Sequence, residues 1–441
     1  MKRTASSNNV VAITVAAMCA FLLSGPALGE DSKVDGAASM YDRGVTCEQT
    51  DAYAEAVKWY RMAADGGVPE AMYALARCYV DGMGMTKDYS EAVNWGRKAA
   101  EGGSLDGMCI LGTLYAKGLG VPQDYTEAIK WYRKAALAGL PKAMHNIGIS
   151  YETGHGATPS NAEALKWYRR AAQAGYANAM SSIGNCYTTG LGVPIDHSEA
   201  LKWYRKAAVA GSPLGMCRLG LCYAKGQGVP EDQEQAAQWF RRAAEAGEPV
   251  AMYNLGIRYT SGQGVQQSDS EAFKWFHGSA CEGTVVAMWN VAQLYRAGRG
   301  VPQNDAEAFR WFNKAAESGM VEAMNTVGVC YVDGQGVRKD QAEGMKWLCK
   351  ASNAGNREAM VNLAGLYADG VDGPKNDAES VKWLLKASEA GSPEGMLRLS
   401  GCYANGRGVT QDMKEAVKWI RKAAETGNAE AKALLKGLEE K

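Results

Sequence analysis

Excess charge, metal-ligand clusters and nucleophile motifs are all missing from this sequence of 441 residues. Its 48 basic side chains balance 48 acidic ones, whereas a nucleic-acid-binding protein usually gathers positive charge on one face. The 4 histidines share no spacing that would form a metal site. Motifs such as Ser-x-x-Lys, Gly-x-Ser-x-Gly and His-Glu-x-x-His do not occur. We therefore predict no nucleic-acid partner, no metal, no cofactor and no enzyme activity.

Long hydrophobic runs are also missing, apart from one near the start of the chain. It extends from Val10 to Leu23, is interrupted only by Thr14, and follows a basic start. A stable transmembrane helix needs about 20 apolar residues, which is more than this run provides. A basic start, a short apolar run and small residues before a cleavage point are typical of an export signal. We predict a signal peptide over residues 1–29, cleaved before Glu30, with no stable membrane insertion afterwards; an uncleaved anchor is the alternative.

Phenylalanine is scarce, with 6 residues, whereas tryptophan is frequent, with 12. All but one of the tryptophans recur at a fixed interval of 36 residues. Each of these is followed by Gly at the eighth residue and by Leu, Ile or Val at the sixteenth. Tyr stands at the twentieth in all but the last unit. Self-similarity at this period is typical of a solenoid of helical hairpins, not of several globular domains. The regularly spaced tryptophans are Trp59, Trp95, Trp131, Trp167, Trp203, Trp239, Trp275, Trp311, Trp347, Trp383 and Trp419.

Each unit divides into two helices. One begins after a residue such as Asp124, which has the spacing of a capping box with Glu127. Gly139 follows its end, as expected of a glycine that terminates a helix with positive φ. The other helix is typified by residues 250–259, whose apolar positions lie on one helical face. Within it, Gly256 lets a neighbouring helix approach closely.

The stability of such an array arises from stacking, because one hairpin cannot cover its own apolar faces. Tryptophan and paired alanines fall on one face of the first helix, so we expect truncation of a tryptophan to cost ~3–5 kcal/mol. The last helix carries Lys432, Lys436 and Glu439 where other units have Met, Gly and Tyr. We predict that this polar helix closes the stack, with the solenoid over residues 50–441 and a polar linker or degenerate half-repeat over residues 30–49.

The repeated motif is Leu-Gly-x-x-Tyr-x-x-Gly-x-Gly-Val-x-x-Asp-x-x-Glu-Ala-x-x-Trp-Tyr-x-Lys-Ala-Ala. It resembles the Sel-one-like repeat (SLR) family, which is related to the tetratricopeptide repeats. The resemblance implies an all-α, right-handed superhelical solenoid of about eleven 36-residue helical hairpins. It also implies use as an interaction scaffold, without specifying a partner or a reaction.

Five cysteines share one repeat position, where equivalent residues of stacked helices should lie ~8–10 Å apart. A disulfide needs Cα atoms within ~7 Å, so we expect these residues to be buried free thiols. They are Cys78, Cys186, Cys222, Cys330 and Cys402.

The variable positions of the repeat are where a binding site should lie. Family analogy places the Leu-Gly-x-x-Tyr helix along a concave groove, with groove side chains two before that Leu, two after it and just past the Tyr. The sole tryptophan outside the regular spacing, Trp289, is two before its Leu-equivalent, with Tyr253 one repeat earlier and Asn325 one repeat later. Gln293 and Arg296 share its helical face. Because aromatics with Arg are typical of binding hot spots, we predict that these five residues bind a peptide or protein segment. The alternative is that Trp289 fills a packing gap.

The leading functional hypothesis is an exported, non-enzymatic scaffold or adaptor that serves complex assembly or signalling regulation. The alternative is a cell-wall-directed or β-lactam-type hydrolase, as in cysteine-rich members of the resembled family. A regulator that sequesters a sensor domain is a third possibility, which the sequence does not separate from the first. The chain contains no Asn-x-Ser/Thr sequon, which favours the periplasm or secretion over the endoplasmic reticulum lumen. The sequence does not predict the oligomeric state.

Overall fold

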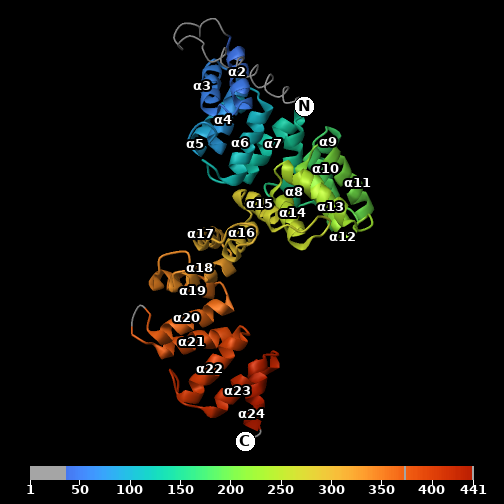
Figure 1. The fold of residues 1–441 in the computed structure, drawn as a ribbon. Coiled ribbons are helices and arrows are strands. Elements are labelled where there is room, and N and C mark those ends of the chain that lie inside the picture. Colours follow the sequence, from blue (N-terminus) through green and yellow to red (C-terminus); the bar gives the residue numbers. More distant parts are fainter. Residues whose placement is uncertain (1–35, 372–373, 440–441) are drawn as a thin grey trace, which may run out of the picture. The chain divides into compact units, whose positions relative to one another are not determined.

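The computed structural model describes residues 36–371 and 374–439 (Figure 1). Within these ranges all helices are α-helices and no strand occurs. The predicted signal peptide, residues 1–29, lies outside the described residues, and none of the described helices is long and apolar enough to cross a membrane. The helices are α2 (Ala37–Gln49), α3 (Tyr53–Asp65), α4 (Pro69–Asp81), α5 (Tyr89–Glu101), α6 (Leu105–Lys117), α7 (Tyr125–Leu137), α8 (Pro141–Thr153), α9 (Asn161–Gln173), α10 (Ala177–Thr189), α11 (His197–Val209), α12 (Pro213–Lys225), α13 (Gln233–Glu245), α14 (Pro249–Ser261), α15 (Asp269–Cys281), α16 (Val285–Ala297), α17 (Asp305–Glu317), α18 (Val321–Asp333), α19 (Gln341–Asn353), α20 (Arg357–Asp369), α21 (Asp377–Glu389), α22 (Pro393–Asn405), α23 (Met413–Glu425) and α24 (Ala429–Glu439).

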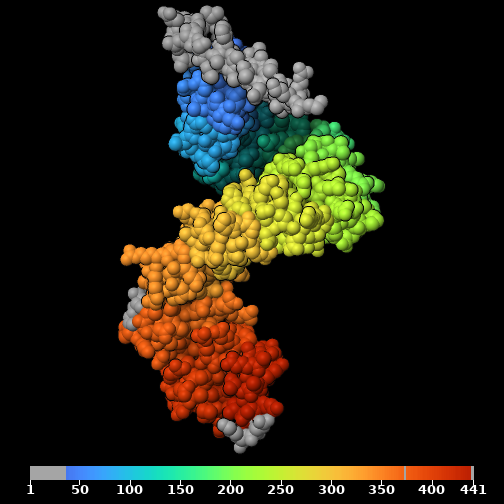
Figure 2. Space-filling view, in the orientation of Figure 1, coloured from blue at the N-terminus to red at the C-terminus, as the bar shows by residue number. Residues whose placement is uncertain are grey.

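The described residues form two compact units, one that ends at Asp196 and one that begins at His197. Within each unit every helix packs against the next one in sequence, and some successive even-numbered helices also touch, namely α4 and α6, α18 and α20, and α20 and α22. This arrangement confirms the predicted all-α solenoid of stacked hairpins. Residues 37–49, for which we predicted a linker or a degenerate half-repeat, form α2, which packs against α3. In the C-terminal unit the surface passes through the repeats in sequence order, from green to red (Figure 2).

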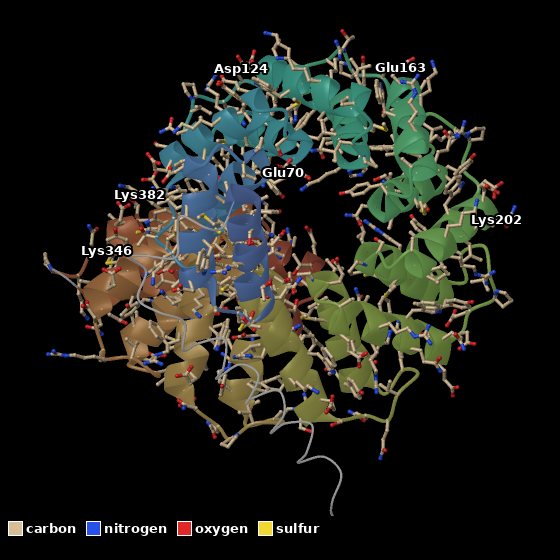
Figure 3. The ribbon with its side chains drawn as sticks, turned by 90° about the horizontal axis from the view of Figure 1, so that it is seen from above. Glu70, Asp124, Glu163, Lys202, Lys346 and Lys382 are labelled. Atoms are coloured by element: carbon tan, nitrogen blue, oxygen red, sulfur yellow. The ribbon has the colours of Figure 1, made fainter. Side chains whose placement is uncertain are left out.

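The even-numbered and odd-numbered helices occupy opposite sides of the stack. In the N-terminal unit Glu70, on the even-numbered helix α4, points to the inner side (Figure 3). Asp124 and Glu163, at the starts of the odd-numbered helices α7 and α9, lie on the outer rim (Figure 3). The Leu-Gly-x-x-Tyr helices, which carry even numbers, therefore line the inner side.

The helices begin and end where the sequence signals place them. The side chain of Asp124 accepts a hydrogen bond from the backbone N–H of Glu127, which satisfies one of the free donors at the start of α7. The same bond joins Ser160 to Glu163 at the start of α9. Past the end of α7, Gly139 has a φ of 97°. The predicted cap and the predicted left-handed glycine are both confirmed.

The most deeply buried large side chains include the residues that directly follow the regularly spaced tryptophans. Phe276, for example, is 3% exposed and lies over Gly256, where an added Cβ would approach its ring to 2.6 Å. The predicted close approach at this glycine is confirmed, and Gly112 and Gly328 are in the same situation beneath Tyr132 and Leu348, at 2.7 Å. A small residue on the even-numbered helix thus accommodates a large one on the following odd-numbered helix.

Five of the eleven regularly spaced tryptophans are buried, as predicted, and the other six are less buried than we predicted. Trp311 is 6% exposed, but Trp131, Trp167, Trp203 and Trp239 are only half-buried. In most repeats a Lys or Arg three residues later covers one face of the indole, as Lys134 does on Trp131 at 4.0 Å. Because the indole lies at the rim of the core, its face is open to a cation. We now expect truncation of these half-buried tryptophans to cost less than truncation of the fully buried residue that follows each of them.

The cysteines of the shared repeat position are buried in the helix stack. Cys78, Cys186, Cys222, Cys330 and Cys402 are at most 7% exposed and carry free thiols. Burial raises the pKa of the Cys186 and Cys222 thiols to about 11. These thiols are therefore protonated and unreactive at neutral pH.

Candidate interaction face on the even-numbered helices

One side of the even-numbered helices from α12 to α20 in the C-terminal unit is not covered by other helices. The uncovered residues follow the i, i+4, i+7, i+11 spacing of a single helical face, and none of them is buried. We call this surface the open face. It consists of Leu214, Arg218, Leu221 and Lys225 on α12; Val250, Asn254, Ile257 and Ser261 on α14; Val286, Asn290, Gln293 and Ala297 on α16; Glu322, Thr326, Val329 and Asp333 on α18; and Glu358, Asn362, Gly365 and Asp369 on α20.

Two of the predicted site residues contact one buried ring, and a third is hydrogen-bonded to one of them. Trp289 meets Phe312 edge to face, with ring centroids 5.0 Å apart, and the guanidinium of Arg296 lies 5.4 Å from the same ring. Arg296 also donates a hydrogen bond to the Oε1 atom of Gln293, at 2.6 Å. Phe312 is 1% exposed, Trp289 is half-buried and Arg296 is exposed. The buried ring thus fixes the indole and the guanidinium beside the open face.

Sequence reasoning missed Phe312, although the sequence contains a signal for it. Phe312 directly follows Trp311, at the repeat position that supplies several of the most deeply buried side chains. The same position one repeat earlier holds Phe276, whose ring lies 5.7 Å from that of Tyr253. Each of the two predicted aromatic residues therefore rests on the phenylalanine of the following odd-numbered helix.

Asn325 lies in the seam between two even-numbered helices. It is 9% exposed, and its Oδ1 atom accepts a hydrogen bond from Nδ2 of Asn362 on α20, at 3.0 Å. The same repeat position holds Cys109, which is 1% exposed and lies 3.6 Å from Nδ2 of Asn146. The position two before the Leu therefore lies at the helix–helix contact, and it reaches solvent only where a large side chain such as Trp289 extends beyond the seam.

The open face also carries an apolar patch that we did not predict from the sequence. The residue five before the Leu is Leu214, Val250 and Val286 in three consecutive repeats, whereas the three following repeats have Glu322, Glu358 and Glu394 there. Val250 and Val286 are 49% and 47% exposed, and Ile257 on the same face of α14 is 37% exposed. The run of three apolar residues at one repeat position is visible in the sequence. Our prediction did not include these residues because family analogy placed the groove side chains at other repeat positions.

The open face changes charge along the unit. Its exposed ionisable residues on α12 are basic, namely Arg218 and Lys225. The residues on α14 and α16 are uncharged and half of them are apolar, whereas the exposed ionisable residues on α18 and α20 are all acidic, namely Glu322, Asp333, Glu358 and Asp369. No ion pair involves these four carboxylates in the part of the chain that the structure describes. The face therefore offers a basic end, an apolar middle and an acidic end.

In the N-terminal unit the seam position of α8 holds His145. Its Nε2 atom lies 2.9 Å from the hydroxyl of Ser182, and its ring contacts Tyr168 and Tyr176, each at 5.3 Å between centroids. Burial lowers the pKa of His145 from 6.5 to about 4, because the charged imidazolium loses its hydration there. His145 is therefore neutral at physiological pH.

The low pKa of His145 predicts a loss of stability in mild acid. Between pH 6.5 and pH 4 the unfolded chain binds a proton that the folded chain does not, so the free energy of unfolding falls by up to about 3 kcal/mol. Above pH 6.5 the residue contributes no pH dependence. We expect an NMR titration of the imidazole to give a pKa near 4, and His145→Gln to remove this part of the acid destabilisation. A pKa near 6.5 in the folded protein would contradict the prediction.

The structure shows no group of three or more His, Cys, Asp or Glu side chains arranged to hold a metal ion, among the residues that it describes. The chemistry of the open face is that of an interaction surface: exposed aliphatic side chains with two aromatic rings, Tyr253 and Trp289, beside them, and charges of opposite sign at its two ends.

Comparisons with known proteins agree with this architecture. One crystal structure, of c5321, a protective antigen present in uropathogenic Escherichia coli strains, is 33% identical over 86% of this chain and 81% of that one, with a TM-score of 0.58. That of a Sel1 repeat protein from Oxalobacter formigenes is 30% identical over 71% of this chain and 93% of that one, with a TM-score of 0.51. A comparison with curated protein sequences finds no match.

The family model of the Sel1 repeat matches the chain eleven times without a long interruption. The matched residues are 36–68, 69–104, 105–140, 141–176, 177–212, 213–248, 249–283, 285–320, 321–356, 357–392 and 393–428. Proteins with this repeat generally act as protein-interaction scaffolds, and their fold is typically non-enzymatic. The chain belongs to the Sel1 repeat family.

Proposed function

We propose that this protein is an exported, non-enzymatic scaffold that binds a segment of a partner protein along the open face from α12 to α20. The single observation that carries the proposal is the gradation of this face from basic, through apolar, to acidic. Exposed aliphatic side chains are costly to leave in water, and Val250, Ile257 and Val286 would be covered by such a segment.

The gradation also defines the chemistry of the bound segment. It would have an apolar middle, basic residues over Glu322 and Glu358, and acidic residues over Arg218 and Lys225, because complementary charges set the direction of binding. Trp289 and Tyr253 would contribute stacking area, and Arg296 would meet a carboxylate or a carbonyl of the segment. Gln293 lies on α16 with Trp289 and Arg296, and Asn325 lies on the next even-numbered helix, α18.

Export rests on the signal pattern of residues 1–29, and the compartment we propose is the periplasm or the extracellular space. The N-terminal sequence of the protein recovered from that compartment tests this part. We expect it to begin at Glu30, and a chain that stays in the cytoplasm with Met1 intact would contradict export.

The binding proposal is tested by removing the side chains that border the face. We expect a Tyr253→Ala, Trp289→Ala, Arg296→Ala triple variant to bind the partner about a hundredfold more weakly or worse, since each hot-spot truncation costs about 2 kcal/mol or more. A pull-down from native extract, followed by titration of the recovered partner, measures the loss. Val209→Ala is the matched control, because Val209 is 88% exposed but lies at the end of the odd-numbered helix α11. Equal affinity of the triple variant and the control would place the binding surface elsewhere.

A further inference from the structure

A second recurring feature lies on the side of the odd-numbered helices. In six repeats an arginine two residues after the tryptophan donates a hydrogen bond to the hydroxyl of the tyrosine 18 residues later. Arg61 donates to Tyr79 at 2.6 Å, and its guanidinium also lies 5.8 Å from the ring of Trp95 in the next odd-numbered helix. We call the space between such a tyrosine hydroxyl and the next tryptophan ring the arginine slot. The pairs are Arg61–Tyr79, Arg97–Tyr115, Arg133–Tyr151, Arg169–Tyr187, Arg205–Tyr223 and Arg241–Tyr259.

In the next four repeats the arginine is replaced, first by His277, and the last repeat again has an arginine, Arg421. The imidazole of His277 meets the ring of Trp311 edge to face at 5.3 Å, and its Nδ1 atom lies 3.7 Å from Sγ of Cys281. Tyr295, the tyrosine of this slot, packs on Phe273 at 5.1 Å instead of pairing with an arginine. Its hydroxyl has no hydrogen-bond partner among the residues that the structure describes.

In the repeat that has His277 in place of the arginine, the slot is an open cleft. A cavity of about 540 Å³ lies between α15, α16 and α17, and its lining includes His277, Tyr295, Trp311, Glu307 and Glu317. Burial, together with the nearby carboxylate of Glu307, raises the pKa of Tyr295, so its hydroxyl remains protonated.

Five of the residues that line this cleft have identical counterparts in a filled slot. In the slot that Arg61 fills, Tyr79, Trp95, Glu91 and Glu101 stand at the repeat positions of Tyr295, Trp311, Glu307 and Glu317. Lys98 covers Trp95 at 4.2 Å there, as Lys314 covers Trp311 at 4.1 Å here, so a lysine on the indole is compatible with a bound guanidinium. Arg310, which also lines the cleft, is paired with Glu307 at 2.7 Å.

We propose that the cleft at Tyr295 binds the guanidinium group of an arginine side chain from a partner protein. The chain itself supplies the template, because in the Arg61 slot the equivalent tyrosine hydroxyl and tryptophan ring both contact the protein's own guanidinium. A planar guanidinium can stack on Trp311 while it donates to the Tyr295 hydroxyl, whereas the compact ammonium of lysine cannot do both. This site is separate from the open face, and it does not depend on the function proposed above.

The test uses the mature chain labelled with 5-fluorotryptophan, with the signal of Trp311 assigned from a Trp311→Phe variant. We expect N-acetyl-arginine amide to shift the Trp311 signal in ¹⁹F NMR with saturation in the millimolar range, roughly the affinity of one stacked, hydrogen-bonded side chain. The isosteric but neutral citrulline amide should produce no saturable shift, and N-acetyl-lysine amide should bind several-fold more weakly.

Three variants make the result specific to the slot. His277→Arg should abolish binding, because the chain's own arginine then fills the slot. Tyr295→Phe should weaken binding about tenfold through loss of a charge-assisted hydrogen bond. Tyr259→Phe, in the slot already filled by Arg241, should leave binding unchanged. The proposal is overturned if the citrulline amide binds as well as the arginine amide, if His277→Arg binds as the parent chain does, or if no saturable Trp311 shift occurs.

Discussion

Replacement of Gly264 by alanine is expected to destabilise the C-terminal unit by about 3–4 kcal/mol. Gly264 is the second glycine of the Gly-x-Gly-Val loop that follows α14, and its φ is 72°. Left-handed backbone costs an alanine about 1–2 kcal/mol. The larger effect is steric, because the added Cβ would overlap the carbonyl oxygen of Gln233 at the start of the preceding odd-numbered helix. That obstacle is backbone, so rotation of a side chain cannot relieve it.

Gly283→Ala separates these two contributions. Gly283 has a φ of 90°, but nothing lies within 4 Å of a Cβ placed on it. We expect this variant to lose only about 1–2 kcal/mol, from backbone strain alone. Urea unfolding, followed by circular dichroism, measures both variants against the parent chain. Equal losses of unfolding free energy in the two variants would show that the close contact between the loop and the start of α13 does not require glycine at position 264.

Truncation of Phe312 to alanine is expected to cost about 4 kcal/mol, because the ring is 1% exposed and its removal leaves a cavity. The same substitution would also release Trp289 and Arg296, which both contact this ring. Thermal unfolding measures the first effect and binding of the partner measures the second.

Phe312→Leu is the control that separates stability from binding. Leucine occurs naturally at this repeat position, as Leu348 and Leu384, and both are buried. We therefore expect a loss of stability of about 1 kcal/mol, but binding about tenfold weaker, because the aromatic edge and the face for the guanidinium are gone. If Phe312→Leu binds as tightly as the parent chain, the ring does not position the site.

Much of the fold follows from the sequence, because its signals are local and repeated. A 36-residue period, a cap such as Asp124 and a glycine such as Gly139 each act within a few residues, and every repeat confirms the others. The burial of the tryptophans was harder to predict. Periodicity shows that Trp131 shares a face with the alanines, but it does not show that Lys134 covers its outer side. From the large apolar side chain alone, we therefore predicted deeper burial of the indole than the structure shows.

The candidate site was less predictable, because it depends on contacts between repeats. The position of Trp289 looked like a groove position, yet in most repeats it lies in the helix–helix seam, as the Asn325–Asn362 bond shows. The residues that face solvent instead lie one turn away, at positions such as Val250 and Val286. Which of two adjacent helical faces is covered depends on how the next hairpin packs, and one repeat read alone does not contain that information.

The central claim is that the partner binds on the even-numbered side of the C-terminal unit. The most direct measurement is photo-crosslinking, with p-benzoylphenylalanine placed at Val286 on α16 in one chain and at Lys274 on the neighbouring helix α15 in another. Both side chains are well exposed, but they lie on helices of opposite sides. We expect the partner to crosslink at position 286 and not at position 274. A crosslink at position 274 alone would contradict the claim and place binding on the odd-numbered helices.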